Sequence, residues 1–315
     1  INSGNSWTAS TPIRTLKADK YIFAGINLTP AIINEITSRG LGAFSYKEFE
    51  QSISDLTNPT DGFVMFNTTY PAVTPGDALA TSAEAAKANP ISIPVSRVVA
   101  KAAVVKSTSF VVNGGGTMQN ITYGWRNINR RFYFIPKIDG GIIKDYNWDS
   151  YNVNDFVRGT DQIPVNEATA TPTTFSYALE NSFNYIPGSS LVDQTTFLSI
   201  QGQFLPTQIC RIKTGVTAPQ GATDFEFVNN PNGYGTFYVV RTDDGSSNYF
   251  ITGTDAEKYA ELCIAHAPDM PALTGGYSLS DNTFTNGMCY FHVLVNSAAS
   301  GQYGPYGIYR NQYYR

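Results

Sequence analysis

Hydrophobic and polar positions follow two different periods along this chain. In the first third, Ile32, Ile33 and Ile36 recur at helical spacing, and Thr29 followed by Pro30 supplies an N-cap and a favourable first position. A glycine ends the pattern at residue 40. The sequence therefore predicts a short amphipathic helix between these signals.

A second helix is predicted just after the first. Ser45 and Glu48 have the spacing of a capping box, and Phe49, Ile53 and Leu56 form an apolar stripe. These signals predict a helix that starts at Ser45 and runs to about residue 56.

The alanine-rich stretch 77–88 allows two interpretations. It is either a third helix or a polar surface loop, and Pro90 ends it in both cases.

From residue 91 the apolar positions alternate, which is typical of β-strands. The stretch 94–112 alternates imperfectly and presents small apolar side chains on one face. These are Val98, Ala100, Ala102 and Val104. Short aromatic strands follow up to residue 314, and one helix interrupts them after residue 253, with Thr254 and Glu257 as its capping box.

These patterns predict a mainly β fold with a few short helices. A length of 315 residues suits two domains. The change from helix-bearing sequence to strands falls between Pro94 and Lys106, so we expect domains at 1–100 and 101–315. There is no flexible linker at this point, and we expect the domains to share a strand or a firm interface.

Both ends of the sequence look trimmed. The first residues contain no initiator Met and no signal peptide. The last run, Ile308–Arg315, has the composition of a strand and stops within it. We expect that further strands lie outside this sequence.

The amino-acid composition argues against some classes of function. Only 15% of residues are charged and the formal net charge is −4. This gives no basic surface for nucleic acid, and nucleic acid is not expected as a partner. The low charge and the abundance of small polar and aromatic residues are typical of secreted β-rich surface proteins. No apolar run reaches the ~18 residues of a membrane-spanning helix.

The cysteines and histidines offer one candidate metal site. Cys263 and His266 share a face of the predicted helix, and Cys289 and His292 repeat the spacing. On a strand, however, residues three apart point to opposite faces, so the second pair cannot reach one ion. We therefore predict no metal and no cofactor. A Cys263–Cys289 disulfide is the stronger alternative, and three cysteines cannot all pair with one another.

Nothing in the sequence points to a catalytic centre. No G-x-S-x-G turn accompanies the two histidines, and residues 113–117 lack the Lys of a phosphate-binding loop. A pair of acidic residues for glycoside hydrolysis stays possible, because the partners need not be close in sequence. The aromatic stretch 146–156 could stack on sugar rings, although packing is its more common use.

Several segments, taken in order, resemble the fimbrillins of Bacteroidales bacteria, which are subunits of the type V pilus, and in particular the minor-fimbrium (Mfa-type) subunits. They are RTLKADKYIFAGIN, GFVMFNT, VSRVVAKAAV, YALEN, TTFLSIQGQF, YFHVLVN and YRNQYY. Together they extend over almost the whole chain. The lipobox and the strands at both ends of the family pattern are absent from this sequence.

The resemblance implies two transthyretin-like β-sandwich domains. It implies export as a lipoprotein precursor through the outer membrane, removal of an N-terminal strand by an arginine-specific protease, and a place in a cell-surface fimbrium that supports adhesion and virulence. The implied partners are copies of itself, other fimbrial subunits and host or bacterial surface ligands. Subunits would polymerise when the C-terminal strand of one fills a groove in the next.

The predicted polymerisation groove lies beside Val98, Ala100, Ala102 and Val104, because their small apolar face suits the close approach of an inserted strand. Two alternatives stay open at this point. The protein could be an accessory or tip subunit of the fimbrium, or a secreted glycan-binding β-sandwich protein.

Overall fold

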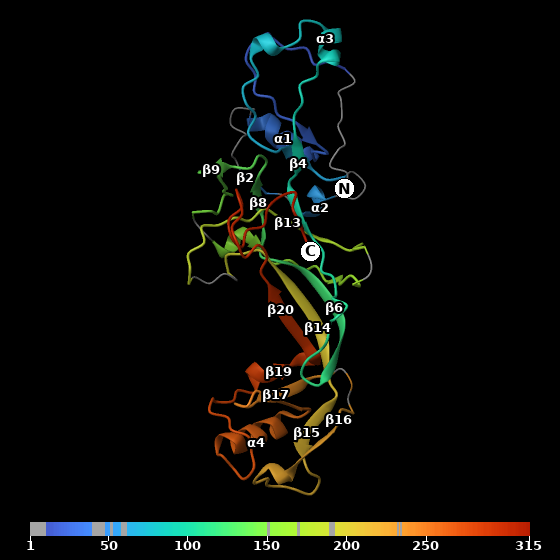
Figure 1. Ribbon diagram of the computed structural model, residues 1–315, viewed down its shortest axis with the longest axis vertical. Coiled ribbons are helices and arrows are strands. Elements are labelled where there is room, and N and C mark those ends of the chain that lie inside the picture. Colours follow the sequence, from blue (N-terminus) through green and yellow to red (C-terminus); the bar gives the residue numbers. More distant parts are fainter. Residues whose placement is uncertain are drawn as a thin grey trace.

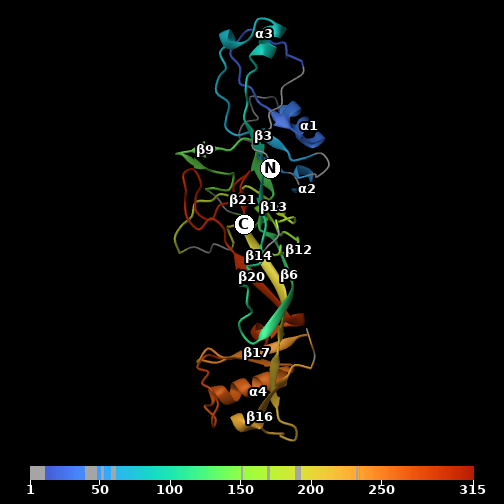
Figure 2. The ribbon, with the colours of Figure 1, turned by 45° about the vertical axis from the view of Figure 1, so that its right-hand side comes forward.

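The computed structural model describes residues 11–39, 48–50, 53–57, 62–149, 152–168, 171–188, 193–231, 233 and 235–315. The molecule is elongated (Figure 1). An N-terminal lobe and a central lobe lie at one end. A stem of three long strands leads to a separate unit at the other end, and Figure 2 shows the same order from a second side.

The N-terminal lobe combines a small sheet with short helices. The antiparallel sheet has the order β1-β3-β4, with β1 at Gly25–Ile26, β3 at Met65–Asn67 and β4 at Val95–Arg97. Helices α1 (Pro30–Arg39), α2 (Ile53–Leu56) and α3 (Ala83–Ala88) accompany it. Ile32 of α1, Leu56 of α2 and Phe66 of β3 share one buried core.

The helix predicted after Thr29 is confirmed. It starts at Pro30, and the Thr29 hydroxyl accepts a hydrogen bond from the Ile32 backbone N–H at 3.2 Å. The 77–88 stretch contains α3, whose first turn is capped by the Ser82 hydroxyl.

The continuous helix predicted from Ser45 to about residue 56 is wrong. Ser45 lies outside the described residues, but Glu48–Glu50 forms strand β2, which pairs antiparallel with β8 (Arg131–Tyr133). Only the last four residues, Ile53–Leu56, are helical. Pairing with a strand 80 residues away overrides the local helical pattern, which is a weak preference over so short a stretch.

The central lobe is a two-layer β-sandwich. One layer has the order β12-β6-β14-β20, with β12 at Ile163–Pro164, β6 at Gly116–Arg126, β14 at Phe197–Pro206 and β20 at Met288–Val293. The other has the order β13-β5-β21, with β13 at Ser176–Leu179, β5 at Val99–Ala102 and β21 at Tyr313–Tyr314. Trp125 and Leu198 of the first layer pack against Ala100 and Ala102 of the second.

Two small antiparallel strand pairs extend the central lobe. Strand β7 (Ile128–Asn129) pairs with β11 (Phe156–Val157), and β9 (Ile138–Asp139) pairs with β10 (Ile142–Ile143).

A separate unit, residues 207–287, is inserted between β14 and β20. We call it the inserted unit. Its strands are β15 (Gln208–Ile212), β16 (Phe225–Asn229), β17 (Phe237–Arg241), β18 (Ser247–Phe250) and β19 (Thr283–Phe284). They form the sheets β15-β16 and β18-β17-β19. Helix α4 (Gly253–Ile264) packs on them, and the core around Cys210, Phe250 and Tyr259 contains only residues of this unit.

The helix in this unit was predicted, but its cap was not. The N-cap is Thr252, whose hydroxyl accepts from the Asp255 backbone N–H at 3.2 Å, whereas Thr254 lies inside the helix. Both threonines have an acidic residue three positions later. The capping pattern therefore fits two possible N-cap positions, which lie two residues apart.

The mainly β fold with short helices is confirmed. The division at residue 100 stays a prediction, since β5 contributes Val99 to the N-terminal core and Ala100 to the sandwich core. Within the described ranges, no helix combines the length and the apolar character needed to cross a bilayer.

Candidate strand-binding groove

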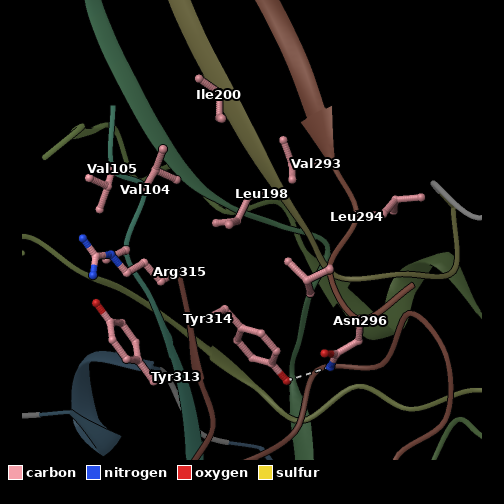
Figure 3. Close-up of a pocket in the computed structure, with 12 residues that line it drawn as sticks. Val104, Val105, Leu198, Ile200, Val293, Leu294, Asn296, Tyr313, Tyr314 and Arg315 are labelled. Carbon is pink, nitrogen blue, oxygen red and sulfur yellow. Dashed lines mark hydrogen bonds between the residues drawn. The ribbon is translucent and has the colours of Figure 1, made fainter. Parts of the chain in front are cut away.

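A groove of about 540 Å³ opens between the two layers of the sandwich, where the smaller layer ends. Figure 3 shows it. Its walls come from the end of β5, from β14, from β20 and from the last residues of the chain. The lining residues are Ala103, Val104, Val105, Leu198, Ile200, Val293, Leu294, Val295, Asn296, Tyr313, Tyr314 and Arg315.

The floor of the groove is a strip of apolar side chains on one face of the larger sheet. Leu198 is paired with Val293, and Ile200 with Phe291. Paired residues share a face, so these four side chains lie together, and they face the same way as Trp125 in the core. The smaller sheet covers Trp125 and leaves the outer part of the strip open.

Strand β20 forms one edge of the groove. It pairs with β14 on one side, and in the described part of the chain it is the last strand of its sheet. Its side chains are unusually exposed for an apolar strand, with 61% of Tyr290, 50% of Phe291 and 38% of Val293 accessible. An apolar edge strand of this kind can pair with another extended chain.

Strand β21 forms the opposite edge. It runs parallel to β5, with Tyr313 beside Lys101, and the Ala103 backbone N–H donates to the Tyr314 carbonyl at 3.0 Å. The Lys101 ammonium lies 3.3 Å from the Phe175 ring centre and 5.3 Å from that of Tyr313. Burial, together with nearby Arg97, lowers the pKa of Lys101.

Two polar side chains in the groove, Tyr314 and Asn296, are already paired. The Tyr314 hydroxyl accepts hydrogen bonds from the Asn296 amide at 3.1 Å and from the Tyr309 backbone N–H at 3.0 Å. Arg315 stands at the rim. The interior therefore suits an apolar occupant that supplies its own backbone hydrogen bonds.

The structure spreads the predicted groove residues over three places. Val98 lies in the core of the N-terminal lobe, and Ala100 and Ala102 lie fully buried in the sandwich core. Strand β5 has β13 on one side and β21 on the other, so no edge is open next to the two alanines. Only Val104 lines the groove.

Sequence reasoning missed the floor residues Leu198, Ile200 and Val293. They lie in TTFLSIQGQF and YFHVLVN, two segments noted only for their resemblance to a family. Their alternating apolar pattern indicated strands, but it could not show which side of the strand would be uncovered.

The candidate metal ligands do not come together. Helix α4 ends at Ile264, and His266 lies beyond it with φ of 50°, so the expected shared helical face with Cys263 does not form. Cys289 packs at the base of the stem, whereas the His292 ring contacts the Phe197 ring at a tilted angle on the other face of the sheet. Among the described residues, no group of three metal-ligating side chains occurs.

The proposed Cys263–Cys289 disulfide is not formed, since all three cysteines are free. Cys263 shares the core of the inserted unit with Cys210, whereas Cys289 packs against a different cluster. Burial raises the pKa of Cys210 to about 12 and that of Cys263 to about 11.

Comparison with known proteins gives one family match, over a single segment, and two structural similarities. Residues 282–315, which contain β20 and the C-terminal edge of the groove, match the family model described as major fimbrial subunit protein type IV, fimbrillin, C-terminal. No curated protein sequence matches the chain.

Two crystal structures of candidate cell adhesion proteins from Parabacteroides distasonis ATCC 8503 are similar to parts of the chain. Each has a TM-score of 0.36 and 15% identity. One match covers 60% of this chain and 55% of the other, so it spans about half the length of that protein. The second covers 73% and 72%. Over residues 282–315 the sequence is therefore similar to the C-terminal part of the fimbrillins.

Proposed function

We propose that this protein is a structural subunit of a bacterial cell-surface fimbrium, and that it polymerises when a β-strand of a neighbouring subunit enters the groove. The fibre then supports adhesion. Partners are copies of this chain and other fimbrial subunits. The subunit is exported through the outer membrane and has no catalytic role.

The observation that carries this proposal is the open apolar strip on the larger sheet of the sandwich. Leu198, Ile200 and Val293 line a groove, and no strand among the described residues pairs with the outer edge of β20 beside it. An added strand can cover the side chains and pair with the backbone at the same time. Burial of apolar surface contributes about 25 cal/mol per Å², so covering even part of the strip favours association.

A charge on the groove floor tests the proposal. Val293 is 38% exposed, so Val293→Asp should leave the isolated subunit folded. An inserted strand would bury that carboxylate without a partner, which costs several kcal/mol. In cells that assemble fibres from this protein, we expect the variant to reach the surface and to be missing from the fibres.

A matched control is available on the hairpin pair β9-β10. Ile138 is 42% exposed and lies outside the groove, so Ile138→Asp introduces the same charge at a similar exposure. This variant should enter fibres as well as the parent protein does. Normal fibres from Val293→Asp would show that the groove does not join subunits.

Two other functions make different predictions. An accessory or tip subunit would appear by immunogold labelling at the fibre end or at isolated points rather than along the shaft. A glycan-binding protein would bind a glycan array as a monomer, and its binding would not depend on Val293. Either result would contradict the proposal that this protein is a structural subunit along the fibre.

A further inference from the structure

The segment Val104–Val112 has the sequence of a strand but not the structure of one. Its sequence, VVKSTSFVV, is rich in β-branched and aromatic residues, and the alternating pattern predicts strand up to residue 112. Strand β5 nevertheless ends at Ala102. Among the described residues, the β-pairing of the segment is limited to an isolated bridge from Val105 to Asn166. The turn-forming run of glycines starts only at Gly114.

The two ends of this segment are anchored, one at the groove and one at the base of the stem. At the upper end Val104 and Val105 line the groove beside Ile200 (Figure 3). At the lower end Val112 packs against the cluster that contains Phe204 and Phe237. The segment therefore follows the same sheet face as the open apolar strip.

Between these anchors the backbone has few partners apart from Asn166, whose carbonyl accepts from the Lys106 N–H at 2.8 Å. The Phe110 N–H donates to the Ser107 carbonyl, and the Ser109 N–H to the Ser107 hydroxyl, both at 3.1 Å. For Thr108, Val111 and Val112, no backbone hydrogen bond from the N–H occurs within the described ranges. The side chain of Val111 is 71% exposed and that of Phe110 is 42% exposed.

We infer that Val104–Val112 is a latent strand, which becomes regular β-structure when an extended chain from another subunit enters the groove and pairs with it. The occupant is a strand with uncharged apolar side chains at alternate positions, because the floor residues Leu198 and Ile200 have that spacing. This inference rests on the proposed function. It adds that the segment is the second pairing edge of the site and that it becomes ordered on assembly.

Physical chemistry favours this over an ordinary loop. Loops are usually polar, and glycine, proline, asparagine, aspartate and serine favour the turns in them. Ser107–Phe110 forms one such turn, held by the carbonyl and the hydroxyl of Ser107. Beside this turn the segment presents the exposed apolar side chains of Phe110 and Val111 next to an open apolar surface. Within the described residues, the N–H groups of Thr108, Val111 and Val112 have no backbone acceptor. Pairing with a strand satisfies the N–H groups and covers the side chains.

Amide hydrogen exchange tests the inference directly. The exchange of residues 104–112 is measured by mass spectrometry in the monomeric subunit and in fibres of the same protein. We expect fast exchange in the monomer and exchange at least about tenfold slower in fibres, as hydrogen-bonded strand amides show. Equally fast exchange in both states would overturn the latent strand.

A proline variant gives a second readout. Val111→Pro removes an N–H that has no acceptor in the monomer, so the monomer should keep its thermal stability. Val111→Ala is the matched control, because it shortens the side chain and keeps the N–H. We expect Val111→Pro to reduce fibre yield at least about tenfold relative to Val111→Ala, since a strand interior does not accept proline.

The possible failures are distinguishable. If Val293→Asp blocks assembly while Val111→Pro assembles normally and the exchange does not slow, the groove joins subunits and the latent strand is wrong. If the parent protein forms no fibres, the proposed function fails and this inference fails with it.

Discussion

Arg310 and Glu180 form a fully buried ion pair, with Arg310 Nη2 2.8 Å from Glu180 Oε2. Their side chains are 5% and 2% exposed. The remaining donors of the guanidinium reach the Phe134 and Tyr133 carbonyls at 2.7 and 2.6 Å. One arginine thus connects the C-terminal segment, the end of β13 and the end of β8, at the point where the N-terminal core meets the sandwich core.

Removing one member of this pair should destabilise the protein strongly. Glu180→Gln removes the carboxylate that directly contacts the buried Arg310 charge, and breaking a buried pair in this way costs about 3–5 kcal/mol. Urea unfolding should show this loss. The control is Glu226→Gln, which breaks the pair of Glu226 with Arg211 at 2.9 Å, whose side chains are 34% and 47% exposed. That change should cost less than about 1 kcal/mol. Equal losses would mean that the buried pair contributes little.

Secondary structure was predictable from the sequence where interactions within the same segment determine it. The helix after Thr29 has its own cap and a proline at its first position, and it forms as expected. The stretch around Phe49 has an equally clear helical pattern, but Phe49 pairs with Phe132 in a strand. The information for that pairing lies 83 positions away, and no local pattern contains it.

The groove could be predicted only in part. The sequence placed apolar strands at TTFLSIQGQF and YFHVLVN, and the structure shows both as neighbours. Which face stays uncovered depends on where the smaller layer ends, and this is a property of the whole sandwich. The inserted unit was not predicted, because the sequence patterns of its strands resemble those of the sandwich strands. The two ends of the unit are far apart in the sequence and come together only in the fold, where Gln203 of β14 pairs with Met288 of β20.

The cap of α4 gives a test at single-residue level. Thr252→Ala removes the hydroxyl that accepts from the Asp255 N–H, and loss of an N-cap costs about 1 kcal/mol. Thr254→Ala changes the neighbouring threonine inside the helix and should be close to neutral. Urea unfolding followed by circular dichroism measures both. A larger loss at Thr254 would mean that the helix begins later.

The three thiols should differ in reactivity. Burial raises the pKa of Cys210 to about 12 and that of Cys263 to about 11, so almost no thiolate is present at pH 8. Cys289 is only partly buried. Iodoacetamide at pH 8 should modify Cys289 first in the folded protein, and all three cysteines in urea. Peptide mass spectrometry identifies the sites, and early modification of Cys210 would contradict the buried core of the inserted unit.

The groove residue Tyr314 should make the protein sensitive to alkaline pH. Burial raises its pKa to about 12, above the ~10 of an exposed tyrosine. The folded state therefore favours the neutral phenol. Its contribution to stability is complete below pH 10 and is lost as the pH rises from 10 to 12.

Tyr314→Phe tests this assignment, because phenylalanine cannot titrate. At pH 8 the variant should be less stable by about 1–3 kcal/mol, since Asn296 and the Tyr309 N–H lose their common acceptor. Between pH 10 and 12 its stability should fall less steeply than that of the parent protein. Urea unfolding at a series of pH values gives both quantities. Parallel curves above pH 10 would show that Tyr314 does not titrate with the expected shift, and that the side of the groove it forms is more open to water than the structure indicates.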